Sequence, residues 1–289
     1  MSKLGMNLMT WTSILDDSVV QYFHRAKDMG YDGVELPIAG LLQADAERYE
    51  RIKTELDLLK LERTCLGGVG PDTNILDEDE GIRHKGKQFM RRCIDVCADL
   101  GSHNLNGVWY APFRVVKNTP RTKREWDFSV EALREAADHA RQKGITIGLE
   151  IINRYETYLV NTIEDALNLV NDIDRDNVKL HIDSYHMNIE ETDFYTPLIK
   201  ARGKISHVHV SDNHRGIPGT GHVNWDDFFR GLRDIDYHGW ITLEVFFASV
   251  EGRPGLSSVM TYRDQVKDLD DVPRRSIKFL REKAKQYGV

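Results

Sequence analysis

Cysteine is scarce in this sequence, with only Cys65, Cys93 and Cys97 among 289 residues. Three thiols without the spacing of a disulfide scaffold exclude a small disulfide-rich secreted protein and fit a reducing compartment. Long hydrophobic runs are also missing, since none approaches the roughly 18 residues that a membrane helix needs, and we expect no membrane partner. The first residues carry no basic leader with an apolar stretch and a cleavage site, so we expect a cytoplasmic protein.

A positive surplus is absent as well, because 39 lysines and arginines face 46 aspartates and glutamates, for a formal charge of −7. Proteins that bind nucleic acids usually gather positive charge for the phosphates, so we expect no nucleic-acid partner. No Pro/Ser-rich linker, low-complexity tract or abrupt change of composition divides the chain. We therefore expect one domain over residues 1–289, ending in a closing helix over residues 272–287.

Short apolar segments alternate with longer amphipathic ones, and this alternation is typical of repeated βα units around a parallel sheet. We expect eight strands, over residues 4–10, 33–37, 62–67, 104–108, 145–151, 178–183, 205–210 and 240–246. Helix-period stretches lie between them, among others over residues 18–29, 47–60, 84–100, 129–143 and 225–235. The sequence predicts an α/β fold, a (β/α)8 TIM barrel, with a doubly wound open sheet as the competing architecture.

The last four predicted strands each direct a polar side chain to the same face. Side chains of a strand alternate with period two, so Glu150 lies opposite the apolar residues of its strand. The same alternation assigns Asp183, His209 and Glu244 to the polar face of the next three strands. Each residue is at or near the carboxyl end of its strand, where barrel active sites lie, so the four side chains should converge.

Four such groups in one register are typical of a metal site, because buried charges need a partner or a metal ion. Three carboxylates and one imidazole suit Mn²⁺, Mg²⁺ or Co²⁺ in six-coordinate geometry better than structural Zn²⁺. The alternative interpretation is a set of separately satisfied polar groups or an ion-pair network.

Several segments carry a specific resemblance. Residues 149–156, 181–191, 207–209, 213–216 and 243–246 are similar to the D-tagatose 3-epimerase and D-psicose (D-allulose) 3-epimerase group of ketose 3-epimerases. This group belongs to the xylose isomerase-like barrels. The string Asp-x-x-His-Met-Asn-Ile-Glu-Glu, which begins at Asp183, is the most specific part, since nothing general about barrels requires it.

The resemblance implies that Glu150, Asp183, His209 and Glu244 bind one divalent metal ion, Mn²⁺ before Co²⁺ or Mg²⁺, and that Glu150 and Glu244 are also the catalytic acid/base pair. It implies an isomerase that epimerises a small ketose at C3 through a metal-stabilised cis-enediolate, with one carboxylate on each face of the sugar. It further implies that Glu156, His186 and Arg215 hold substrate oxygens, and that the protein assembles as a homodimer or homotetramer.

Other positions are less specific. Trp109 and Phe246 fall at strand ends and are expected to wall the sugar pocket, with packing as the alternative. Glu35 has inward parity, with either a supporting role beside the metal or a purely structural one. His207 is expected to be an inward histidine beneath the metal. The glycine-rich residues 216–221 are interpreted as a turn that positions Arg215, with a phosphate cradle as the alternative.

Departures from the group, among them a variant stretch over residues 108–113, limit the choice of substrate. Members commonly have a Gly-Glu pair where this chain has Ser211 and Asp212, and a Trp-Arg pair near the place of Tyr262 and Arg263. Because the glycine-rich loop could cradle a phosphate, a phosphorylated ketose also stays open as a substrate class. So do aldose–ketose isomerisation, dehydration of a keto-inositol, a multi-zinc nuclease and a non-catalytic sugar-binding barrel.

Overall fold

Eight parallel strands form a closed barrel in the computed structural model, which describes residues 1–12, 15–247 and 268–289. The strands follow one another around the barrel in chain order, and β1 pairs with β8 to close it. Their bounds are β1 Lys3–Asn7, β2 Gly33–Pro37, β3 Glu62–Gly68, β4 Asn104–Val108, β5 Thr146–Glu150, β6 Val178–Asp183, β7 Ile205–Val210 and β8 Trp240–Leu243. The TIM barrel is confirmed, and the doubly wound sheet is wrong.

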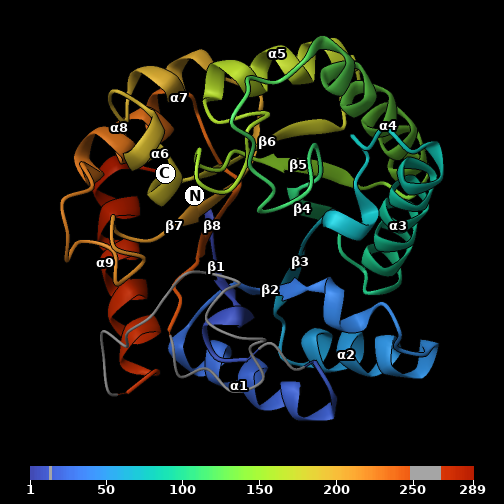
Figure 1. Ribbon diagram of the computed structural model, residues 1–289. Coiled ribbons are helices and arrows are strands. Elements are labelled where there is room, and N and C mark those ends of the chain that lie inside the picture. The colour runs from blue at the N-terminus through green and yellow to red at the C-terminus, as the bar shows by residue number, and fades with distance from the viewer. Residues whose placement is uncertain (13–14, 248–267) are drawn as a thin grey trace.

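Helices surround the strands on the outside of the barrel (Figure 1). They are α1 Val20–Met29, α2 Ala46–Leu58, α3 Glu80–Asp99, α4 Lys123–Gln142, α5 Ile163–Ile173, α6 Ser184–Glu190, α7 Thr196–Lys200, α8 Trp225–Asp234 and α9 Asp271–Tyr287. The closing helix is α9, and the hydroxyl of Tyr31 donates a 2.9 Å hydrogen bond to the carbonyl of Pro273 at its start. The three cysteines are buried free thiols.

The predicted strand bounds are correct for β2, β4, β6 and β7, but strand 1 ends earlier than predicted. The side chain of Asn7 accepts a hydrogen bond from the backbone N–H of Met9, and this contact turns the chain into a short 3-10 helix, Leu8–Thr10. Strand 8 also ends early, at Leu243, although the N–H of Glu244 still donates to the carbonyl of Val210 at 3.1 Å. That bond keeps Glu244 aligned with the barrel.

Two helices begin earlier than the apolar periodicity predicted. Helix α3 starts at Glu80 behind the N-cap Asp79, and α4 starts at Lys123 behind a capping box of Thr122 and Glu125. The first turns of both helices are polar, so a search for an apolar stripe misses them.

Tyr262 and Arg263, which stand near the place of the group's Trp-Arg pair, lie outside the described residues. In the described part of the chain, no helix combines the length and the hydropathy that a membrane span requires.

Candidate metal centre and active site

Four acidic or imidazole side chains meet at the carboxyl ends of β5 to β8. Glu150 and Asp183 are the last residues of β5 and β6, His209 is the penultimate residue of β7, and Glu244 directly follows β8. One ligand atom from each lies within 4.8 Å of the others, and all four residues are buried. The structure thus brings together the four side chains singled out by parity. We call them the mouth cluster.

The electrostatics of the mouth cluster favour a cation. Burial raises the pKa of Glu150 to about 7, and the carboxylates of Glu244 and Asp183 add to the rise against the opposing effect of His209. The cluster holds three carboxylates, and the one guanidinium described among them is that of Arg215. This surplus of buried negative charge, presented by oxygen atoms, is the environment that a divalent metal ion would stabilise.

The ring of His209 has two different neighbours. Its Nε2 atom lies 2.6 Å from Oε2 of Glu35, and its Nδ1 atom lies 3.3 Å from Oε1 of Glu244 and 3.8 Å from Oε1 of Glu150. Burial lowers the pKa of His209, but the carboxylates of Glu244 and Glu35 outweigh it and raise the pKa well above its usual range. Nδ1 is therefore the nitrogen that His209 presents to the cluster. Three carboxylates and one imidazole nitrogen fit Mn²⁺, Co²⁺ or Mg²⁺.

Arg215 already pairs with two of the carboxylates. Its Nη1 atom donates to Oδ2 of Asp183 at 2.7 Å and to Oε2 of Glu244 at 2.9 Å. The guanidinium carbon lies 4.1 Å from the ring centroid of Tyr185 and 5.2 Å from that of Phe246. The ion-pair network considered as the alternative to a metal site is therefore present in part, but it leaves Glu150 without an arginine partner among the described residues.

His186 and Arg215 present two hydrogen-bond donors to one point. Burial lowers the pKa of His186 to about 4, helped by Arg215 and opposed by Asp183, so the ring is neutral at neutral pH. Its Nδ1 atom accepts from the backbone N–H of Asn153 at 3.1 Å, which leaves the ring proton on Nε2. That Nε2 lies 3.0 Å from Nη2 of Arg215. Since both groups donate, they do not satisfy each other, and a substrate oxygen placed beside the two nitrogens would accept from both.

Asn153 joins His186 to Glu156. Its Oδ1 atom accepts from the N–H of Tyr155 at 2.9 Å, which turns the amide nitrogen toward Oε1 of Glu156 at 3.0 Å. Glu156 is thereby held near His186, and its substrate-binding role stays a prediction. The sequence interpretation assigned no role to Asn153, although it lies inside the segment that carries the resemblance.

Trp109 is buried and has a packing role that is visible in the structure. Its Nε1–H donates to the carbonyl of Asn106 at 3.1 Å, and its ring lies so close to Gly67 that a Cβ there would come within 2.9 Å. Its predicted contact with substrate stays a prediction, as does that of Phe246, whose ring lies beside Arg215.

The loop after β7 is organised around Asp212. Its buried carboxylate accepts from the backbone N–H of Asn213 at 2.9 Å, of Gly219 at 2.8 Å and of Val223 at 3.2 Å, and from the indole of Trp225 at 3.2 Å. These donors are the groups that a phosphate would need, and a carboxylate already occupies them. The contacts favour the interpretation of residues 216–221 as a turn, and Arg215, which directly precedes it, takes a left-handed backbone conformation with φ 59°.

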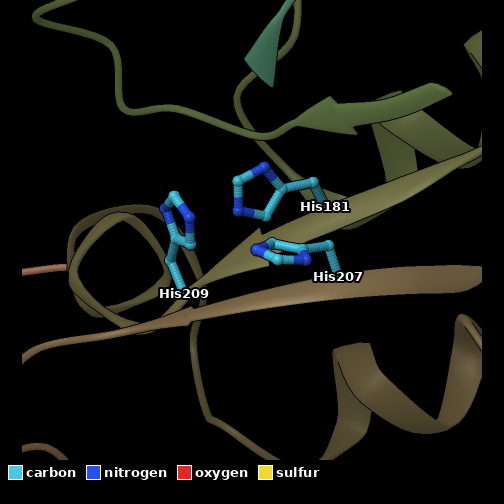
Figure 2. A group of neighbouring side chains, drawn as sticks. All are labelled: His181, His207 and His209. Atoms are coloured by element: carbon cyan, nitrogen blue, oxygen red, sulfur yellow. The ribbon is translucent and has the colours of Figure 1, made fainter. Parts of the chain in front are cut away.

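Three histidines form a second group on β6 and β7. The rings of His181, His207 and His209 point toward one another (Figure 2), with ligand atoms that lie within 4.8 Å. Nε2 of His207 lies 3.0 Å from Oε1 of Glu35, so two of the three rings face the same carboxylate. This contact supports the interpretation of His207 as an inward histidine beneath the mouth cluster.

Comparisons with known proteins agree with the barrel and its site. Residues 23–283 match the family described as xylose isomerase-like TIM barrel. A ketose 3-epimerase of Arthrobacter globiformis is 32% identical over 283 residues, covering 97% of this chain and 96% of the relative. The L-ribulose 3-epimerase of Methylomonas sp. is 32% identical over 254 residues, covering 88% and 87%. A crystal structure of a Methylomonas sp. D-allulose 3-epimerase with D-allulose superposes with a TM-score of 0.92 at 30% identity, covering 98% and 97% of the two chains.

The fold and the mouth cluster therefore define a sugar-processing enzyme of the isomerase class, and the chain belongs to the xylose isomerase-like TIM barrel family. Its relatives further place it with the ketose 3-epimerases of that family.

Proposed function

We propose that this protein is a metal-dependent epimerase that inverts C3 of a small ketose. The observation that carries the proposal is the meeting of Glu150, Asp183, His209 and Glu244 at one point, beside the paired donors of His186 and Arg215. The relatives named for 3-epimerisation of ketoses support the choice of carbon and substrate class.

The four residues of the mouth cluster would hold one divalent cation, with Mn²⁺ as the first choice and Co²⁺ or Mg²⁺ as substitutes. A bound cation supplies positive charge that stabilises negative charge developing on the substrate's C2 and C3 oxygens. Arg215 contributes a second positive charge at the same place, because its guanidinium contacts Asp183 and Glu244 directly.

Glu150 and Glu244 are the proton-transfer groups in this proposal. One carboxylate takes the C3 hydrogen as a proton, and the electron pair of that C–H bond moves into the enediolate. The other carboxyl group, which is protonated at the start, returns a proton to C3 from the opposite face. The number of protons is conserved, and the configuration at C3 is inverted.

The neighbouring residues orient the ketose. The N–H groups of His186 and Arg215 would donate to one substrate oxygen, and Glu156, fixed by Asn153, would accept from a substrate hydroxyl. Trp109 and Phe246 are proposed to wall the pocket.

Three further properties stay predictions from the sequence. They are a cytoplasmic location, a single domain over residues 1–289 and assembly as a homodimer or homotetramer.

The test is an incubation of the Mn²⁺-loaded protein with free and phosphorylated ketoses in D₂O, followed by NMR. Deuterium at C3 with inverted configuration is the expected result. Deuterium at C1 or C2 with an aldose product would instead establish aldose–ketose isomerisation, and loss of water would establish a dehydratase. The absence of any exchange from every ketose would refute the proposal.

A further inference from the structure

Glu35 on β2 is a fully buried carboxylate that belongs to no part of the proposed reaction. Its two oxygens face five side chains from four other strands, and every one of these residues is buried. They are His209 at 2.6 Å, His207 at 3.0 Å, Asn7 at 3.1 Å, Thr64 at 3.2 Å and Asn106 at 3.4 Å. We call this group the Glu35 network. A buried charge with this many partners holds each of them in a defined orientation.

The contact with His209 determines which ring nitrogen carries a proton. Oε2 of Glu35 accepts from the amide nitrogen of Asn7 at 3.1 Å, and Oε1 accepts from the hydroxyl of Thr64 at 3.2 Å, so both carboxylate oxygens act as acceptors. Nε2 of His209, at 2.6 Å, must therefore donate. In the neutral ring this leaves the lone pair on Nδ1, which is the atom that faces Glu150 and Glu244.

A second route leads from Glu35 to Glu244 through Asn7. The Oδ1 atom of Asn7 accepts from the backbone N–H of Met9 at 2.9 Å, so the orientation of the amide is fixed and its nitrogen faces the barrel interior. That nitrogen lies 3.1 Å from Oε2 of Glu35 and 3.2 Å from Oε1 of Glu244. One amide group thus sets the separation of the two carboxylates.

We infer that Glu35 is a positioning residue of the metal centre, which fixes the tautomer and ring orientation of His209 directly and the carboxylate of Glu244 through Asn7. The inference rests on the proposed function, because it assumes that His209 and Glu244 bind the metal. Carboxylates that accept a hydrogen bond from a metal-bound histidine orient the ring and raise its basicity, and their loss typically costs 10- to 100-fold in metal affinity or activity.

Glu35→Gln tests the inference with almost no change in volume. The amide offers one acceptor where the carboxylate offers two, so His207 and His209 compete for it and the negative charge is lost. We expect the Kd for Mn²⁺, measured by isothermal titration calorimetry, to rise about 10- to 100-fold. The EPR spectrum of bound Mn²⁺ should change shape, and kcat at saturating Mn²⁺ should fall more than KM rises.

Thr64→Val is the matched control, because Thr64 donates to Oε1 of Glu35 at 3.2 Å but contacts no member of the mouth cluster. Both variants remove a buried hydrogen bond and should lower the melting temperature. Only Glu35→Gln should weaken Mn²⁺ binding and alter the EPR spectrum, whereas Thr64→Val should keep the wild-type Kd within about twofold.

Two negative results have different meanings. If the wild-type protein binds Mn²⁺ and Glu35→Gln binds it equally well with the same spectrum, or if Thr64→Val weakens binding as much, Glu35 is only structural and the inference is wrong. If the wild-type protein itself binds no Mn²⁺, Co²⁺ or Mg²⁺, the proposed function fails and the inference fails with it.

Discussion

The two halves of the barrel carry polar side chains inside for different purposes. In the half formed by β5 to β8, Glu150, Asp183 and Glu244 lie at or just beyond the ends of their strands and face one another, so their charges are incompletely compensated. In the half formed by β1 to β4, Asn7 and Glu35 are held by mutual hydrogen bonds, and their contacts with His207, His209 and Glu244 cross to the other half.

This difference separates the residues proposed for catalysis and metal binding from the residues that hold them in position. Carboxylates that face other carboxylates can gain a cation, whereas a carboxylate whose oxygens already face five polar side chains has no capacity for a ligand. The half formed by β5 to β8 is therefore expected to control catalysis and metal binding, and the half formed by β1 to β4 is expected to control the geometry of the site. Each prediction below changes one half and states what the other should do.

Glu244→Gln should have the largest effect, because it changes the half that carries the proposed chemistry. The variant keeps the shape of the side chain but removes both a proposed metal ligand and one of the two proposed proton-transfer groups. We expect kcat for ketose epimerisation to fall about 10²- to 10⁴-fold, which is the usual contribution of general acid–base catalysis. The measurement is steady-state turnover at saturating Mn²⁺. Glu35→Gln should cost clearly less, and equal losses in the two variants would remove the proposed division between the halves.

The sequence predicts these two halves unequally well. Alternation within a strand identifies Glu150 and Asp183 by local pattern alone, since period two and the strand end are both readable. The partner of Glu35 is not readable, because His209 is 174 residues away and meets it only when the barrel closes. Parity assigned Glu35 to the inside of the barrel, but its role depends on which strands lie opposite one another. Asn153 was missed for a similar reason, as its function depends on the distant ring of His186.

Gly107→Ala should have a large effect on stability in the supporting half. Gly107 on β4 has φ +124°, and a Cβ there would lie 1.8 Å from the carbonyl oxygen of Gly67 on β3. Backbone strain and overpacking together should lower the free energy of unfolding by about 3 kcal/mol. Urea denaturation measures this change. Gly70→Ala is the control, since a Cβ at Gly70 meets nothing within 4 Å. A stable Gly107→Ala variant would contradict the view that this half provides rigid geometry.

Arg215→Lys should affect substrate binding in the catalytic half. A lysine cannot donate to Asp183 and Glu244 with one nitrogen while presenting a second nitrogen beside His186. We expect KM for the ketose to rise about 10- to 100-fold, with a smaller loss of kcat. Arg154→Lys is the control, because Arg154 also forms an ion pair through two guanidinium nitrogens, with Glu190, but its side chain is largely exposed. An unchanged KM in Arg215→Lys would separate Arg215 from substrate recognition.

The smallest expected effect concerns Glu125, which links a loop of each half. It accepts from Lys117 on the loop after β4 and from the hydroxyl of Tyr158 on the loop after β5 at 2.7 Å, and from the N–H of Thr122 at 2.8 Å. Burial would raise the pKa of Glu125, but these hydrogen bonds outweigh it and lower the pKa from 4.5 to about 2. Because the folded-state pKa is depressed, the stabilisation is complete above pH 4.5 and is lost as the pH falls toward 2.

Glu125→Gln should therefore lower the free energy of unfolding by about 1 to 2 kcal/mol near neutral pH and by clearly less at about pH 3.5. Urea denaturation of both proteins at the two pH values measures the difference. Activity at neutral pH should be almost unchanged, because Glu125 contacts no member of the mouth cluster. If the difference in free energy of unfolding between the two proteins stays constant with pH, the charge of Glu125 does not stabilise the contact between the two loops. A large loss of activity would instead mean that the position of these loops is part of catalysis, and that the boundary between the halves is functional.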